Sequence, residues 1–142
     1  MQIFNYIYKP TFEEVENFKF ETYDENTGIG VKAYEKPGGI LTLLDRLIGM
    51  LYDNPTSRQA ILPLHTVDFV SCFLTMQVQL DLDNKIVYVT TNFRSQATAY
   101  KEKDSRMVNY LITILKRELK IEDYAVDMTA NVGNYHKINT IG

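Results

Sequence analysis

The stretch KIVYVTTNFRSQATAYKEKDSRMVNYLITILKREL, residues 85–119, decides the fold. Its first nine residues are rich in valine, isoleucine and threonine, which predicts a strand over residues 85–93. Apolar residues then recur three and four positions apart, which predicts a helix over residues 103–119 that starts with Asp104 or Ser105 as its N-cap. A strand followed by an amphipathic helix indicates a helix layer packed on a sheet.

The flanking segments extend this pattern in both directions. The same reasoning predicts further strands over residues 1–9, 31–34, 60–64, 67–80 and 124–132, a second principal helix over residues 40–53, and a short helix from Thr11. The polar residues 81–84 predict a hairpin turn, so the strands on either side should pair antiparallel. We therefore expect an α+β fold, a mainly antiparallel sheet with two principal helices packed on one face, in a single domain over residues 1–142.

The composition excludes several classes of partner. The 142 residues carry 15 basic and 18 acidic side chains, so the net charge is −3 and no nucleic-acid-binding surface is expected. No apolar run reaches the roughly 18 residues that a membrane span needs. Two histidines without a His/Cys cluster argue against a metal site, and the single cysteine, Cys72, fits a reducing compartment. We expect a cytoplasmic protein that binds no metal, no membrane and no nucleic acid.

Three short motifs follow one another around the predicted central strands. The first is a helix end at Asn54-Pro55, followed by Arg58. The second is Cys72, five residues before Gln77 in an apolar strand, and the third is the pair Arg94-Ser95 at a strand end. In this order and with these separations, the motifs resemble the central region of the thymidylate synthase and pyrimidine hydroxymethylase family. The resemblance covers roughly residues 40–138.

The resemblance implies a thymidylate synthase-like fold and a covalent mechanism. Cys72 would be the nucleophile that adds to C6 of a pyrimidine, and Gln77 would help to orient the nucleotide. The attack makes C5 nucleophilic toward a one-carbon donor, which in the family is methylenetetrahydrofolate. On a regular strand Cys72 and Gln77 face opposite sides, so both can line one pocket only if the strand carries a bulge, as it does in the family.

The resemblance also assigns the phosphate and sugar contacts of a pyrimidine nucleoside monophosphate. Arg58, Arg94 and Ser95 would hold the phosphate, because a guanidinium matches phosphate oxygens with two hydrogen bonds. In the family some of these arginines come from the partner subunit of a homodimer. Tyr135 would contact the sugar. We expect Cys72, Arg94, Ser95 and Tyr135 to line one cavity, with Arg58 at its edge.

The base contact has two candidates on the second predicted helix. In the family an Asn on this helix, or an Asp in the cytosine-specific hydroxymethylases, reads the pyrimidine edge, and Asp104 or Asn109 could occupy that place. An Asp accepts a hydrogen bond from the amino group of cytosine, whereas an Asn can pair with uracil. The sequence leaves both residues, and therefore both bases, open.

The chain departs from the family pattern at four positions that carry chemistry. Phe73 stands where the family has His directly after the nucleophile, and Gln59 replaces a second arginine. Ala97 replaces an Asp, and Gly133 opens the element that reads His-x-Tyr in the family. These departures leave two hypotheses. The first is a C5 one-carbon transferase acting through Cys72, and the second is a non-catalytic nucleotide-binding or protein-interaction module of the same fold.

Overall fold

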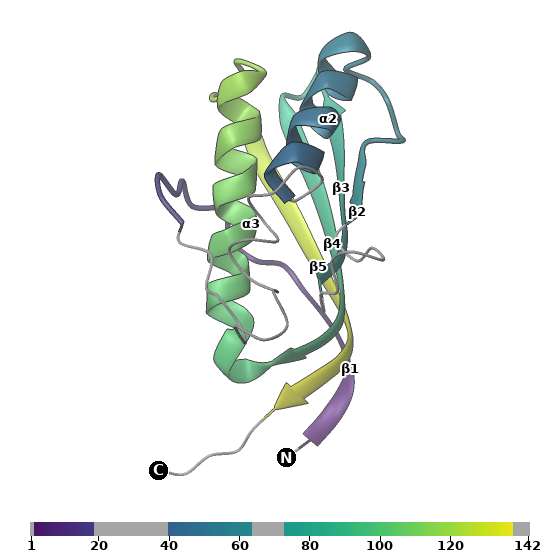
Figure 1. The fold of residues 1–142 in the computed structure, drawn as a ribbon, viewed down its shortest axis with the longest axis vertical. Coiled ribbons are helices and arrows are strands. Elements are labelled where there is room, and N and C mark those ends of the chain that lie inside the picture. Colours follow the sequence, from purple (N-terminus) through teal and green to yellow (C-terminus); the bar gives the residue numbers. More distant parts are fainter. Residues whose placement is uncertain (1, 19–39, 64–72, 138–142) are drawn as a thin grey trace.

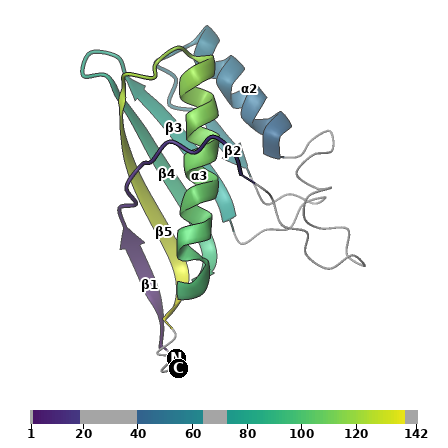
Figure 2. The same cartoon turned by 90° about the vertical axis from the view of Figure 1, so that its left-hand side faces the viewer.

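The computed structural model describes residues 2–18, 40–63 and 73–137, and shows one sheet with both helices on the same face (Figure 1, Figure 2). The elements follow in the order β1 (Gln2–Tyr8), α2 (Ile40–Asp53), β2 (Ile61–Pro63), β3 (Phe73–Asp81), β4 (Ile86–Ala97), α3 (Thr98–Glu118) and β5 (Ala125–Lys137). The strand predicted over residues 31–34, the first part of the strand predicted over residues 67–80, and Cys72 lie outside the described residues.

The sheet has five strands in the order β1-β5-β4-β3-β2. Three of its pairings are antiparallel, including the predicted hairpin of β3 and β4, in which Asp81 accepts hydrogen bonds from the backbone and side chain of Asn84. β4 and β5 are parallel, because α3 carries the chain back across the sheet between them. The expected mainly antiparallel α+β sheet is confirmed.

The core lies between the two helices and the sheet. α2 begins and ends where its apolar spacing and the following Asn54-Pro55 predict. The helices and the sheet bury apolar side chains against each other, and the largest fully buried ones are Leu44, Leu51, Leu62, Met76, Val78, Val87, Val89, Leu111, Ile112 and Leu115. Burial of this apolar surface supplies the main stabilisation of the layered fold.

α3 starts earlier than predicted. The helix begins at Thr98, directly after β4, and its N-cap residue Ala97 makes no side-chain capping bond. The predicted cap residues Asp104 and Ser105 therefore lie inside the helix, in its second turn. The reason is that residues 98–103 contain alanine, lysine and glutamate, which favour a helix without a polar cap to mark its start.

The short helix predicted from Thr11 is wrong. Residues 9–18 instead run without regular structure across the side of α3 that faces away from the sheet (Figure 2). The backbone N–H of Val15 donates to Oγ1 of Thr113 at 3.1 Å, and Arg117 pairs with two glutamates of the segment. Contacts with α3 thus replace the hydrogen bonds that a local helix would have made.

Candidate functional site

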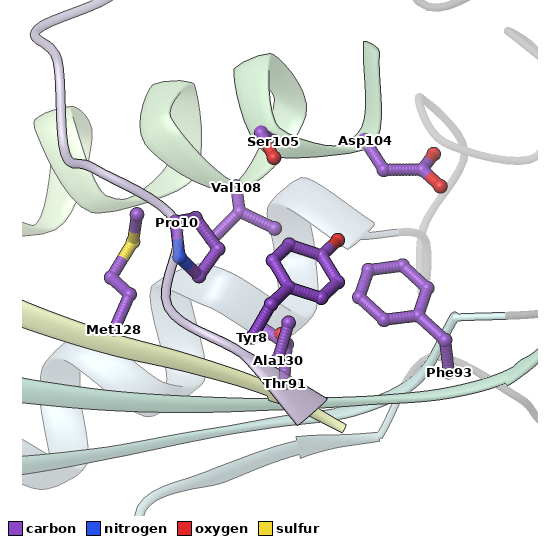
Figure 3. Close-up of a pocket in the computed structure, with 9 residues that line it drawn as sticks. All are labelled: Tyr8, Pro10, Thr91, Phe93, Asp104, Ser105, Val108, Met128 and Ala130. Atoms are coloured by element: carbon purple, nitrogen blue, oxygen red, sulfur yellow. The ribbon is translucent and has the colours of Figure 1, made fainter. Parts of the chain in front are cut away.

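A pocket lies between β1, α3 and the helix-covered face of the sheet (Figure 3). It is a small hollow that is partly open to solvent, with about 250 Å³ of empty space when the solvent at its open side is included. Asp104 and Ser105 line it from α3, Tyr8 and Thr91 line it from the strands, and the rest of its walls are apolar. The lining residues are Tyr8, Pro10, Thr91, Phe93, Asp104, Ser105, Val108, Met128 and Ala130.

Three side chains form a hydrogen-bonded array at this pocket. The Tyr8 hydroxyl donates to Oε1 of Gln96 at 2.8 Å, and Nε2 of Gln96 donates to Oδ2 of Asp104 at 2.8 Å. Gln96 is 3% exposed, so both ends of its amide are satisfied within the protein. The array uses one carboxylate oxygen of Asp104 and leaves Oδ1 outside it.

Burial raises the pKa of both acidic groups of the array, Asp104 and Tyr8. Burial raises the pKa of Asp104 above its ordinary value, although the hydrogen bond from Gln96 and the charge of Lys103 oppose this shift. Burial also raises the pKa of Tyr8 to about 12, so the phenol remains a hydroxyl donor at neutral pH. A carboxylate with little water around it gains more from a hydrogen-bond donor on a ligand than an exposed one does.

An aromatic cluster continues from the pocket along β1 and β5. The Tyr6 ring stacks on Tyr8 with a centroid separation of 5.2 Å and lies 4.7 Å from the Tyr135 ring, which also meets Phe4 at 5.5 Å. Nζ of Lys101 lies 4.3 Å from the centroid of Tyr8, within range of a cation–π interaction. Tyr135 is buried in this cluster and does not line the pocket.

Neither Arg94 nor Ser95 lines the pocket. The alternation of buried residues along β4 breaks between Phe93 and Gln96, which are both buried, and Ser95 between them is only partly buried. Its Oγ lies 2.8 Å from Nε2 of His136. Arg94 is exposed beside the buried Phe93. The single cavity expected for these residues and Tyr135 is therefore not the pocket that contains Asp104.

Arg58 and Gln77 form a separate pair. Nε2 of Gln77 donates to the backbone oxygen of Arg58 at 3.3 Å. Gln77 pairs across the sheet with Thr90, which precedes Ser95 by five positions, or about 16 Å along β4. Within one chain, the structure does not bring this pair together with Ser95.

β3 is irregular near its start, where the hypothesis of a nucleophilic Cys72 requires a bulge. The pairing of β3 with β4 shifts register between Phe73 and Thr75. As a result Phe73 and Met76, three residues apart, are both buried. This bulge falls within the interval from Cys72 to Gln77, although Cys72 itself is not described.

The two candidates for the base contact differ in position. Asp104 lines the pocket, whereas Asn109 does not. Asn109 is 5% exposed, and its Oδ1 has no hydrogen-bond partner among the described residues. It lies one turn before Thr113, on the part of α3 that residues 9–18 cover. Of the two, Asp104 is the residue that a ligand in this pocket would meet.

At two positions where the family has histidines, this chain has residues without a polar side chain. The Phe73 ring stacks on Phe93 with a centroid separation of 4.6 Å, so it belongs to the core. A Cβ atom at Gly133 would lie 3.1 Å from the backbone oxygen of Arg94, which leaves little room for any side chain. The histidines of the family therefore have no counterpart at these positions.

Sequence reasoning missed Gln96 and the hydroxyl role of Tyr8. The sequence offered one indication, a glutamine directly after Arg94-Ser95. In the structure this glutamine lies in β4 and is buried. Across the described residues, no three His, Cys, Asp or Glu side chains are grouped so that they could hold a metal ion. Neither helix in the described ranges is long and apolar enough to cross a membrane.

The sheet order, the two helices on one face and the β3 bulge together define an α+β fold of the thymidylate synthase type. The solved structure of thymidylate synthase from T4 phage is similar to this chain with a TM-score of 0.59 and 16% sequence identity. The match covers 80% of this chain and 40% of that enzyme, so the chain spans two fifths of its length. No family model and no curated protein matches the sequence. The expected thymidylate synthase-like fold is confirmed.

Proposed function

We propose that this protein binds a pyrimidine nucleoside monophosphate, with the base in the pocket that Asp104 lines. The observation that carries the proposal is the half-buried carboxylate of Asp104, which Gln96 holds directly and Tyr8 holds through Gln96, at a pocket with mostly apolar walls. Few convergent polar groups in an apolar hollow are typical of small-molecule sites. We place the protein in the cytoplasm.

The proposed base carries an amino group, as cytosine does. An ionised carboxylate only accepts hydrogen bonds, and Oδ2 of Asp104 already accepts one from Gln96. Oδ1 would accept from the 4-amino group of cytosine. The carbonyl oxygen at the same position of uracil would instead face a carboxylate without a donor, which is unfavourable in a buried site.

The phosphate contacts are proposed at the end of β4. Ser95 lies two residues before the end of this strand, so a nucleotide lying across the strand end can contact both of its faces. Arg94 and Ser95 would hold the phosphate, and Tyr135 would lie beneath the sugar. Arg58, with Gln77, would come from the partner subunit of a homodimer, because this pair is about 16 Å from Ser95 in its own chain.

Binding without turnover is the function that the geometry supports best. Phe73 and Gly133 replace two family histidines with a core ring and a crowded glycine. Transfer through Cys72 is the second candidate, and the β3 bulge between Cys72 and Gln77 is the observation that favours it. Methylenetetrahydrofolate would then supply the one-carbon unit.

Calorimetric titration with deoxycytidylate and deoxyuridylate tests the binding proposal. We expect deoxycytidylate to bind more tightly, and Asp104→Asn to reverse the preference, since an asparagine can donate to the uracil carbonyl. A change of roughly tenfold in the affinity ratio corresponds to about one good hydrogen bond. Asp53→Asn, at the exposed end of α2, is the matched control. Absence of binding by either nucleotide would overturn the proposal.

Intact-mass measurement separates binding from transfer. The protein is incubated with 5-fluoro-deoxyuridylate or 5-fluoro-deoxycytidylate, with and without methylenetetrahydrofolate. A covalent adduct that disappears in Cys72→Ser supports transfer through the thiol. Nucleotide binding without an adduct supports the non-catalytic function.

A further inference from the structure

The array at the pocket joins three elements that are distant in sequence. Tyr8 comes from β1, Gln96 from the end of β4 and Asp104 from α3. Tyr8 and Gln96 are 88 positions apart. The hydrogen bonds of Tyr8 and Gln96 are made within the array, whereas Oδ1 of Asp104 lies outside it. The polar groups of Tyr8 and Gln96 therefore act on a ligand through Asp104.

We propose that Tyr8 and Gln96 are positioning residues that make Asp104 an acceptor only, so that β1 takes part in selecting the base. The inference rests on the proposed nucleotide site and adds to it the residues that set its preference. Neither residue needs to touch the nucleotide's amino group for this role.

The direction of the hydrogen bonds carries the argument. A glutamine amide has a donor end and an acceptor end, whereas an ionised carboxylate accepts only. Gln96 must therefore turn its NH₂ toward Asp104 and its oxygen toward Tyr8, and the Tyr8 hydroxyl must donate. If that hydroxyl were removed, the buried Oε1 would lose its donor, and the amide would gain by turning its oxygen toward Asp104. A carboxylate facing that oxygen would be destabilised relative to the protonated acid. The single proton of the acid would bond to Oε1 of Gln96, and Oδ1 would become a neutral and therefore weaker acceptor for the amino group of the base.

Tyr6 provides a matched control within the same cluster. Its ring stacks on Tyr8, and Nζ of Lys101 lies 5.4 Å from its centroid and 4.3 Å from that of Tyr8. Tyr8→Phe removes one hydroxyl from the array and keeps the ring that lines the pocket. Tyr6→Phe removes one hydroxyl from a neighbouring ring that is not part of the array.

The first experiment needs no nucleotide. The pKa of the Asp104 carboxyl is measured by carbon-13 NMR titration in the wild type, Tyr8→Phe, Tyr6→Phe and Gln96→Leu. Because the hydrogen bond from Gln96 holds this pKa down, we expect Tyr8→Phe and Gln96→Leu to raise it further and Tyr6→Phe to leave it unchanged. An Asp104 pKa that is the same in Tyr8→Phe and the wild type would overturn the positioning role.

The second experiment measures base selection. We expect Tyr8→Phe to lower the ratio of deoxycytidylate to deoxyuridylate affinity roughly three- to tenfold, the effect of about one hydrogen bond, and Tyr6→Phe to preserve the ratio. A wild type that prefers deoxycytidylate, with the same ratio in Tyr8→Phe, would overturn this inference and leave the proposed function standing. A wild type that binds neither nucleotide would overturn the proposed function and the base-selecting role together.

Discussion

Asp104, the residue proposed to contact the base, is held in its ionised form at a cost to stability. Its carboxylate is largely shielded from water, and burial raises its pKa above the ordinary value of 3.8. A raised pKa in the folded protein means that ionisation opposes folding. A residue that is unfavourable for the fold and lies in a pocket is a candidate for a functional role.

The pH dependence of stability provides a prediction for this residue. At a pH below 3.8 the carboxyl is protonated in both folded and unfolded chains and carries no penalty. As the pH rises through the raised pKa of the folded state, stability is lost. Asparagine stays neutral and can still accept from Gln96, so we expect Asp104→Asn to raise the Tm by a few degrees at pH 7. The gain should vanish at acidic pH.

Thermal unfolding between pH 3 and pH 8 measures this effect. Asp83→Asn, in the exposed turn between β3 and β4, is the control and should leave the Tm within about 1 °C of the wild type. An Asp104→Asn variant that is equally stable relative to the wild type across the whole range would contradict the prediction.

The sequence predicted Asp104 as a site residue but not the array that holds it. Asp104 was found because the resemblance assigns an acidic or amide residue to this part of the helix. Tyr8 and Gln96 act through contacts between segments that only the folded sheet brings together. A local pattern carries no information on such contacts, and hydrogen-bond direction depends on all three partners at once.

At the scale of single elements, the sequence predicted best where a strong stop signal ends an apolar pattern. α2 has its predicted bounds because Asn54-Pro55 ends the helix. The start of α3 was wrong because the residues before Asp104 are also good helix formers. Thr11 and Glu14 have the spacing of a capping box, but the segment folds over α3 instead. In the last case tertiary contacts outweighed a local preference.

The segment over α3 gives a prediction at this scale. Val15 is 7% exposed, and its N–H donates to the buried Oγ1 of Thr113. We expect Thr113→Val to lower the free energy of unfolding by about 1–3 kcal/mol, because a buried donor loses its acceptor. The pairs of Arg117 with the glutamates are exposed and should contribute less.

Urea unfolding of Thr113→Val tests this contribution. Thr90→Val is the control, since Thr90 is only partly buried and lies in a strand, where valine is favoured. We expect the control to stay within about 0.5 kcal/mol of the wild type. Equal stabilities of the two variants would show that the segment adds little to the fold.

For the molecule as a whole, the main feature is the face of the sheet opposite the two helices. Both helices lie on the other face (Figure 1), so this face presents half-buried polar residues joined across the strands. Asn92 donates to Thr75 at 2.9 Å and accepts from Asn131 at 3.3 Å. Large exposed apolar residues flank them, including Ile7 at 68% and Ile61 at 47% exposed. Such a face suits the homodimer that the resemblance implies.

Sedimentation velocity tests the homodimer. We expect the protein to sediment as a dimer at micromolar concentration, and Ile61→Glu to raise the dissociation constant at least tenfold, or by about 1.4 kcal/mol. Leu82→Glu replaces an apolar residue in the exposed β3–β4 turn and is the control. A wild type that remains monomeric would remove the proposed contribution of Arg58 from a partner subunit.

The pairing of β1 with β5 joins Tyr8 to Ala130, across most of the chain. Contacts between such distant segments close late during folding, whereas the β3–β4 hairpin closes over a few residues. We therefore expect the β1–β5 pairing, which brings Tyr8 to Gln96, to be among the slower steps of folding. Detachment of this edge strand would abolish the proposed discrimination between bases while most of the helix-covered core stayed intact, which would make that preference a sensitive reporter of native topology.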